Sequence, residues 1–118
     1  MAEKPMLYRI FYPSPDGEYI AYIGRSNADL TRRLRHHFLA SHKFQKKLFL
    51  CEKTRVETAK FDTVANMFVA EIAYINIEKP PLNVDDKADD ELTLPVDLSG
   101  VKWKPWEKAH LLEKWRTP

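Results

Sequence analysis

The chain has 118 residues, of which 44% are hydrophobic and 31% charged, as in folded globular domains. A chain of this length can bury roughly two-thirds of its unfolded surface around one core. No apolar run approaches the ~20 residues of a bilayer span, and the N-terminal sequence lacks the apolar region of a secretory signal. We therefore expect a single-domain cytoplasmic protein without a membrane segment.

Charge is unevenly distributed along the chain, although the formal net charge is only +2. Residues 25–60 carry ten Lys and Arg against three acids, whereas residues 84–118 carry six against eight. The first region is therefore expected to attract anions. Cys51 is the only cysteine, which excludes an internal disulfide and a thiolate zinc site, so a bound metal would need oxygen ligands.

Two short segments near the N-terminus have the composition of β-strands. Residues 6–12 (MLYRIFY) and 18–24 (EYIAYIG) are rich in strand formers, and the turn-forming PSPDG separates them. The pattern predicts a β-hairpin. If its loop is symmetric, Tyr8 lies directly opposite Tyr22 on one face of the sheet, although a bulge would shift this register.

A helix is expected directly after the hairpin. Ser26 and Asp29 form a capping pattern, which predicts a helix over residues 27–40. Its apolar side chains recur on one face, at Leu30, Leu34 and Phe38. Arg33 lies at the border of this face and is expected to be held partly against the core. A second, shorter helix is expected over residues 44–51.

The next expected elements are a third strand and the clearest helix of the chain. Residues 55–61 (RVETAKF) alternate as a strand would, and a cap at Asp62 or Thr63 predicts a helix over residues 64–77, ended by KPP. Its expected inward face is apolar, with Val64, Met67, Phe68 and Ile75. Glu71 also falls on this face, where a carboxylate normally acquires a proton, a cationic partner or a metal.

The C-terminal extension, residues 85–118, begins acidic and ends rich in tryptophan. We expect it to pack on the same domain, with a short helix after Pro105 and with Trp106 and Trp115 facing the body of the protein. This segment is expected to cover the core; stacking on nucleic-acid bases is the alternative.

Two tyrosines, a semi-buried arginine and an isolated carboxylate suit a phosphodiester substrate. A guanidinium can clamp phosphate oxygens, a carboxylate can hold Mg²⁺, and a tyrosine near such charges can accept a proton. Gly24, at the end of the second strand, is expected to let the backbone approach a phosphate closely.

Over residues 6–84 the chain resembles a GIY-YIG nuclease domain, and its motif spacing is closest to the excision-repair type. Residues 6–8 (MLY) stand where the family has Gly-Ile-Tyr, with Met6 in place of the glycine, and residues 22–24 (YIG) reproduce the second signature. The loop between the two tyrosines is a few residues longer than is usual in the family.

The remaining motif positions lie on the two expected long helices. Residues 30–37 follow the family's RLxxH spacing, with Arg33 at the arginine and His37 at the histidine. Glu71 matches the metal-binding glutamate, and Asn83 matches the asparagine that closes the motif.

The resemblance implies a small α/β (α+β) domain over residues 1–84, a three-stranded antiparallel sheet flanked by helices in the order β-β-α-α-β-α. It implies a divalent-metal-dependent endonuclease that holds one Mg²⁺ or Mn²⁺ ion on Glu71. The catalytic residues so implied are Tyr8, Tyr22, Arg33, His37 and Glu71, and which tyrosine is the base stays open. The substrate-binding residues expected are Gly24, Arg25, Arg32, Arg35, Lys46, Lys47 and Asn83.

DNA is the expected substrate, held by salt-dependent contacts from basic side chains that carry little sequence information. The extension is too short for a separate DNA-binding domain, so we expect low sequence specificity or a partner protein that supplies targeting. Two alternatives stay open. One is a catalytically inactive nucleic-acid-binding or recruiting module on the same fold, and the other is a protein-interaction domain that uses the acidic tail and tryptophans.

Overall fold

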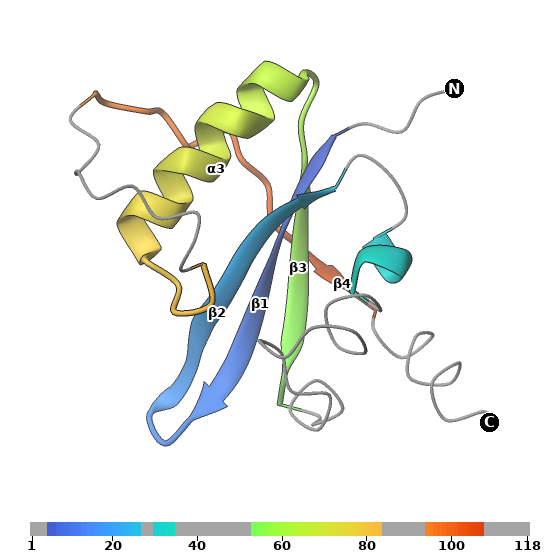
Figure 1. Ribbon diagram of the computed structural model, residues 1–118, viewed down its shortest axis with the longest axis vertical. Helices are drawn as coiled ribbons and strands as arrows, with labels where there is room; N and C mark the ends of the chain where they lie inside the picture. Colours follow the sequence, from blue (N-terminus) through green and yellow to red (C-terminus); the bar gives the residue numbers. More distant parts are fainter. Residues whose placement is uncertain (1–4, 27–29, 35–52, 84–93, 108–118) are drawn as a thin grey trace.

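The computed structural model describes residues 5–26, 30–34, 53–83 and 94–107. They form a mixed α+β fold whose elements, in chain order, are β1 (Met6–Ser14), β2 (Gly17–Ser26), β3 (Arg55–Lys60), α3 (Val64–Glu78) and β4 (Lys104–Trp106). The antiparallel strands lie in the order β2-β1-β3-β4, so β2 and β4 are the edges of the sheet (Figure 1). The predicted fold class is confirmed, and the sheet of the described residues has one strand more than the three predicted.

β1 and β2 form the predicted hairpin, but in a different register. Tyr8 pairs with Gly24, not with Tyr22 as predicted, and Tyr22 pairs with Ile10. Gly17, whose φ is 132°, closes a tighter turn than expected, and a bulge after Ile10 shifts the pairing once more. Because the two shifts together preserve the alternation of side chains, Tyr8 and Tyr22 still share a face, with ring centroids 6.0 Å apart.

A different helix covers each face of the sheet. α3 packs on the face that carries Leu7, where Met67 is fully buried. Residues 30–34 are helical and cover the other face, where Leu34 is buried in one cluster with Tyr8. The strands run between these two helical segments (Figure 1), so the central strand β1 is buried from both sides.

α3 begins and ends close to where the sequence predicts. The hydroxyl of Thr63 accepts a hydrogen bond from the Asn66 backbone N–H at 3.0 Å and so caps the first turn. Lys79 adopts a left-handed conformation with φ 46°, and its N–H donates to the carbonyl of Ile75 at 2.8 Å. The prolines that follow prevent the helix from continuing.

The predicted inward face of α3 is partly wrong. Met67, Ile75 and Glu71 are buried as expected, but Val64 and Phe68 are 44% and 39% exposed. Ala70 lies against the sheet instead, in the cluster with Leu7 and Met67. The small side chain of Ala70 lets the helix pack close to the strands. The prediction counted only large apolar residues, so it left out Ala70 and chose a face that is rotated away from the observed one.

The C-terminal extension contributes β4 to the sheet. Trp106 pairs with Val56 of β3, so it lies in a strand and not in the helix predicted after Pro105. An edge strand tolerates Pro105 because one side of its backbone makes no ladder bonds, so a proline can be placed there without loss of a donor. Residues 108–118, the predicted helix over 44–51 and the predicted continuation of the first helix beyond residue 34 lie outside the described residues.

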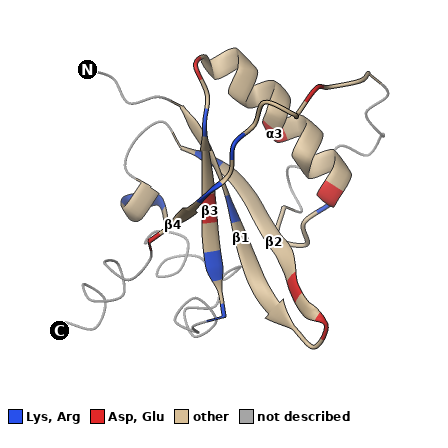
Figure 2. Ribbon diagram, turned by 180° about the vertical axis from the view of Figure 1, so that it is seen from behind, with Lys and Arg blue, Asp and Glu red and all other residues tan. Residues whose placement is uncertain are grey.

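Among the described residues, the two helical segments carry opposite charge, whereas acidic and basic side chains pair with one another on the sheet. The helix α3 carries Glu71 and Glu78 with no Lys or Arg, whereas residues 30–34 carry Arg32 and Arg33 (Figure 2). Asp16 lies in the turn between β1 and β2, and Glu18 follows at the start of β2. None of the described helices is long and apolar enough to cross a membrane.

Candidate active site

Gly24 is the point of the sheet on which two tyrosine side chains meet. A Cβ atom at Gly24 would lie 2.6 Å from both Cζ and Oη of Tyr8 and 2.7 Å from Cε1 of Tyr22. These distances are far below ordinary van der Waals contact, so no side chain fits there. The space that was expected to admit a phosphate is filled by the two rings, and the glycine is needed for tyrosine packing.

Arg33 adds a positive charge to this tyrosine pair. Hydrogen bonds join its guanidinium to the hydroxyls of Tyr8 and Tyr22. The bond to Tyr8 raises the pKa of Arg33 above its usual value. The side chain is more exposed than predicted, so its outer surface faces solvent while its tip is anchored on the phenols. We call Tyr8, Tyr22 and Arg33 the tyrosine–arginine cluster.

Tyr8 is fully buried and holds its proton firmly. Burial raises the pKa of its phenol well above the usual range, and the neighbouring Tyr22 adds to this effect. The hydrogen bond from Arg33 acts in the opposite direction but does not cancel the rise. Because a general base must be able to lose its proton near the working pH, Tyr8 is better suited to orienting Arg33 than to accepting a proton.

Glu71 lies buried on α3 with a cationic partner. Its Oε1 is 2.9 Å from Nη1 of Arg25 on β2. The guanidinium of Arg25 also lies over the ring of Phe68, 4.7 Å from its centroid. The glutamate side chain is 10% exposed and the arginine side chain 49%. A carboxylate on this face was expected to acquire a proton, a cationic partner or a metal. The structure shows a cationic partner, and this partner is Arg25 rather than Arg33.

Asn83 is buried against the outer edge of β2. Its Oδ1 accepts a hydrogen bond from the Ile23 N–H at 2.9 Å, and its Nδ2 donates to the Ile23 carbonyl at 2.8 Å. The N–H of Leu82 donates to the Ala21 carbonyl at 3.0 Å in the same way. The amide of Asn83 thus satisfies strand groups that would otherwise be open, which occupies the polar atoms that were expected to bind substrate.

The two charged groups lie on opposite faces of one strand. Gly24 and Arg25 are neighbours in β2, so Arg25 points to the α3 face while the tyrosines that cover Gly24 lie on the other face. The catalytic residues implied by the resemblance are therefore divided, with Glu71 on one side of β2 and Arg33, Tyr8 and Tyr22 on the other. Because β2 is an edge strand, both clusters lie at the same margin of the sheet.

A metal ion at Glu71 would have few protein ligands. Within the part of the chain that the structure describes, no three His, Cys, Asp or Glu side chains are grouped to hold a metal. One carboxylate is nevertheless compatible with Mg²⁺, which keeps several waters and commonly binds through one or two carboxylates together with substrate phosphates. The residues present therefore fit an ion that is completed by water and substrate.

The remaining site predictions fall into two groups. Arg32 is exposed in the helical segment beside Arg33. Four others lie outside the described residues, namely Arg35, His37, Lys46 and Lys47. The role of Phe68 beside Arg25 was missed, because nothing in the sequence tells which face of the sheet α3 covers.

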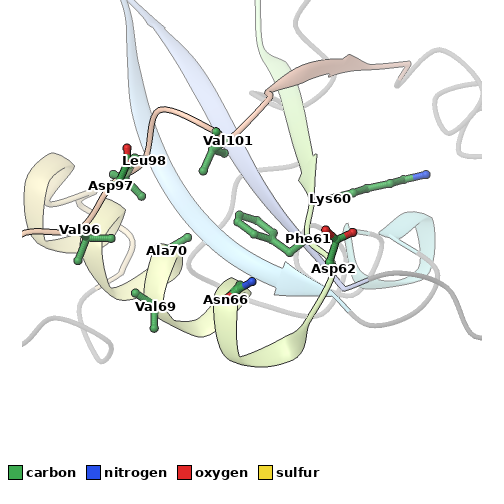
Figure 3. A pocket seen from close by; sticks show the side chains of 11 residues that line it. Lys60, Phe61, Asp62, Asn66, Val69, Ala70, Val96, Asp97, Leu98 and Val101 are labelled. Carbon is green, nitrogen blue, oxygen red and sulfur yellow. The ribbon is translucent and has the colours of Figure 1, made fainter.

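A pocket of about 410 Å³ lies apart from both clusters. It opens between the first turns of α3 and the segment that precedes β4, and Phe61, Val69 and Leu98 are among the side chains that line it (Figure 3). None of the predicted site residues lines it, so the candidate site is the part of β2 around Gly24 and Arg25 and not this pocket.

The likeness to GIY-YIG nucleases rests on short motifs spread over residues 6–84, with few fixed positions. Of these motif segments, the structure describes residues 6–8, 22–24, 30–34, Glu71 and Asn83. Comparison of the chain with models of known protein families, with curated proteins and with solved structures gives no match in any of the three.

Proposed function

We propose that this protein is a divalent-metal-dependent endonuclease of the GIY-YIG type, which hydrolyses phosphodiester bonds of nucleic acid, with DNA as the expected substrate. The observation that carries the proposal is the hydrogen-bonded cluster of Tyr8, Tyr22 and Arg33. The partners of Arg33 in this cluster are neutral phenols. The guanidinium therefore keeps a full positive charge that a phosphate can neutralise.

Each residue of the cluster has a role that follows from its surroundings. Arg33 stabilises the negative charge that develops on the phosphoryl oxygens, and such electrostatic stabilisation commonly contributes more to phosphoryl-transfer rates than any other effect. Tyr8 keeps its proton and fixes the guanidinium. Tyr22 is then the phenol left to position the attacking water, because it lies nearer the solvent than the fully buried Tyr8.

Glu71 and Arg25 complete the proposed site from the other side of β2. When bound at Glu71, a Mg²⁺ or Mn²⁺ ion would neutralise the scissile phosphate. Arg25 is half exposed, so its guanidinium can reach a phosphate oxygen of the nucleic-acid strand that carries the scissile phosphate. Basic side chains such as Arg32 would add salt-dependent affinity without sequence recognition, which leaves targeting to a partner protein.

The second candidate function is a nucleic-acid-binding or recruiting module on the same fold that does not cleave. One observation favours it, since the only carboxylate proposed as a metal ligand is already neutralised by Arg25. This module would bind DNA through the same arginines and leave the phosphodiester bonds intact.

The test is incubation of the protein with plasmid, branched DNA and RNA, with and without Mg²⁺ or Mn²⁺. We expect metal-dependent nicking that Glu71→Ala and Arg33→Ala both abolish. Unchanged cutting by both variants would contradict the site. Salt-dependent binding without nicking in either metal would favour the non-cleaving module, and absence of any such binding would favour a protein-interaction domain.

A further inference from the structure

We propose that Arg25 exchanges partners when substrate binds: Glu71 holds it in the free protein, and a phosphate of the nucleic acid takes it when a metal ion occupies Glu71. The inference rests on the proposed function and deepens it. It makes metal binding and nucleic-acid binding depend on each other through one side chain.

The geometry of the pair is suited to exchange. A single contact joins Nη1 of Arg25 to Oε1 of Glu71, at 2.9 Å, rather than the two parallel contacts of a bidentate pair. A phosphate offers the guanidinium a second oxygen and a free approach from solvent. The contact that is lost can therefore be replaced by a stronger one.

The surroundings of the two side chains differ in the way that exchange requires. Glu71 is fixed in the protein with 10% of its side chain exposed, whereas Arg25 is 49% exposed on β2. The guanidinium lies over the ring of Phe68, which is itself 39% exposed. This cation–π interaction does not depend on the carboxylate. The ring of Phe68 can therefore continue to support the guanidinium when Arg25 leaves Glu71.

Competition between two cations gives the exchange its direction. A divalent ion at Oε1 of Glu71 and the guanidinium at the same atom would repel each other at contact distance. An ion that takes Oε1 would therefore release Arg25 into water, and a phosphate that binds Arg25 would draw it from Glu71. When both bind, each removes the obstacle to the other, which is positive linkage.

A simpler interpretation is that the pair only fastens α3 to β2. Removing the carboxylate would then weaken the fold and leave nucleic-acid affinity unchanged apart from the general effect of one charge. The two interpretations differ in the absence of metal, where no catalysis takes place.

The first experiment measures binding of a short fluorescent DNA duplex to the full chain in a chelator, over a range of salt concentrations. We expect Glu71→Gln to bind about two- to fivefold more tightly than wild type, because the carboxylate no longer competes with the phosphate for the half-exposed guanidinium of Arg25. A plot of the logarithm of its DNA-binding constant against the logarithm of the salt concentration should be steeper than for wild type, by the amount expected for about one more phosphate contact.

The matched control is Glu78→Gln, which removes the same charge from the exposed end of the same helix. It should leave the salt dependence as in wild type. The double variant Arg25→Ala with Glu71→Gln should lose the gain in affinity. Equal gains in Glu71→Gln and Glu78→Gln, or a gain that survives in the double variant, would overturn the exchange.

The second experiment keeps Glu71 and needs no nucleic acid. Mn²⁺ binding is followed by electron paramagnetic resonance for wild type, for Arg25→Ala and for Lys102→Ala, which removes an exposed cation elsewhere. Arg25→Ala should bind Mn²⁺ about two- to fivefold more tightly than the other two. Equal or weaker binding by Arg25→Ala would contradict the exchange.

Failure of the exchange can be told from failure of the proposed function. If wild type nicks DNA in Mg²⁺ while both experiments show no gain, the exchange is wrong and the nuclease stands. If wild type shows no salt-dependent DNA binding at all, both fail together.

Discussion

The absence of a side chain at Gly24 leaves the space in which the rings of Tyr8 and Tyr22 pack against each other. Both rings occupy the volume in which a Cβ atom would lie. The tyrosine hydroxyls are thereby brought within reach of Arg33, so the charge of the proposed site depends on a residue that has no functional group of its own.

We expect Gly24→Ala to lower the free energy of unfolding by about 1–3 kcal/mol, because the added methyl group overpacks the tyrosine pair. Gly100→Ala is the control, since a Cβ there meets nothing within 4 Å, and we expect a change within about 0.5 kcal/mol. Urea denaturation of both variants measures the difference. Equal effects would contradict the packing around Gly24.

The buried phenol of Tyr8 predicts a loss of stability at alkaline pH. Its native pKa is raised above the unfolded value near 10, so above that pH the unfolded chain releases a proton that the native state retains. The contribution of the Tyr8 phenol to the free energy of unfolding is therefore fully present below pH 10. Above pH 10 it falls by about 1.4 kcal/mol for each pH unit until the native pKa is reached.

Tyr8→Phe removes this dependence. We expect the variant to be less stable than wild type by about 1 kcal/mol at pH 8, through the lost hydrogen bonds, and the difference to narrow as the pH rises past 10. Denaturation between pH 8 and 11 measures it, with Tyr19→Phe as the control for removal of an exposed phenol. Parallel curves for wild type and Tyr8→Phe would argue against a buried, protonated Tyr8.

At the scale of elements, the sequence predicts what depends on local pattern. Strand-forming residues around a turn predict the hairpin, and a cap, an apolar repeat and a double proline predict α3. The register of the hairpin was not predictable, because a bulge at Ile10 has no marker in this sequence. β4 was not predicted either, since three residues that include a proline carry no strand period.

The arrangement of the site depends on tertiary packing that local pattern does not contain. The sequence correctly places Glu71 on an inward face of α3, but the helix also uses Ala70 for this face, and it packs on the side of β2 to which Arg25 points. The cluster of Arg33 with Tyr8 and Tyr22 therefore forms on the opposite face. Only the three-dimensional position of α3 decides which arginine meets the carboxylate.

Asn83 shows how a residue after α3 completes the edge of β2. We expect Asn83→Ala to lower the free energy of unfolding by about 2–3 kcal/mol, because it leaves the N–H and carbonyl of Ile23 without partners in a buried position. Hydrogen exchange at the Ile23 amide should become faster. Asn66→Ala is the control, because it removes an exposed amide side chain in the first turn of α3. If Asn83→Ala changed the free energy of unfolding as little as Asn66→Ala, Asn83 would not complete the edge of β2.

For the whole molecule, the distribution of charge indicates which end of the sheet a polyanion approaches. Asp16 and Glu18 lie at one end of the hairpin, where Arg55 of β3 pairs with Glu18, and Gly24 with Arg25 lies at the other end (Figure 2). The exposed Arg32 and Arg33 and the half-exposed Arg25 therefore attract a phosphate backbone to the margin of β2 beside residues 30–34. Both clusters of the proposed site lie at this margin.

The most direct test of the proposed catalytic role compares two adjacent arginines in steady-state cleavage of a short labelled DNA with Mg²⁺. Arg33 is anchored on the tyrosines, whereas Arg32 beside it is exposed. We expect Arg33→Ala to lower kcat by about 10²–10³-fold at saturating DNA, as removal of a transition-state charge does. Arg32→Ala should mainly raise KM and reduce the salt dependence of binding by about one contact. A wild-type kcat in Arg33→Ala, or the same loss of kcat in both variants, would contradict the assignment of the tyrosine–arginine cluster to catalysis.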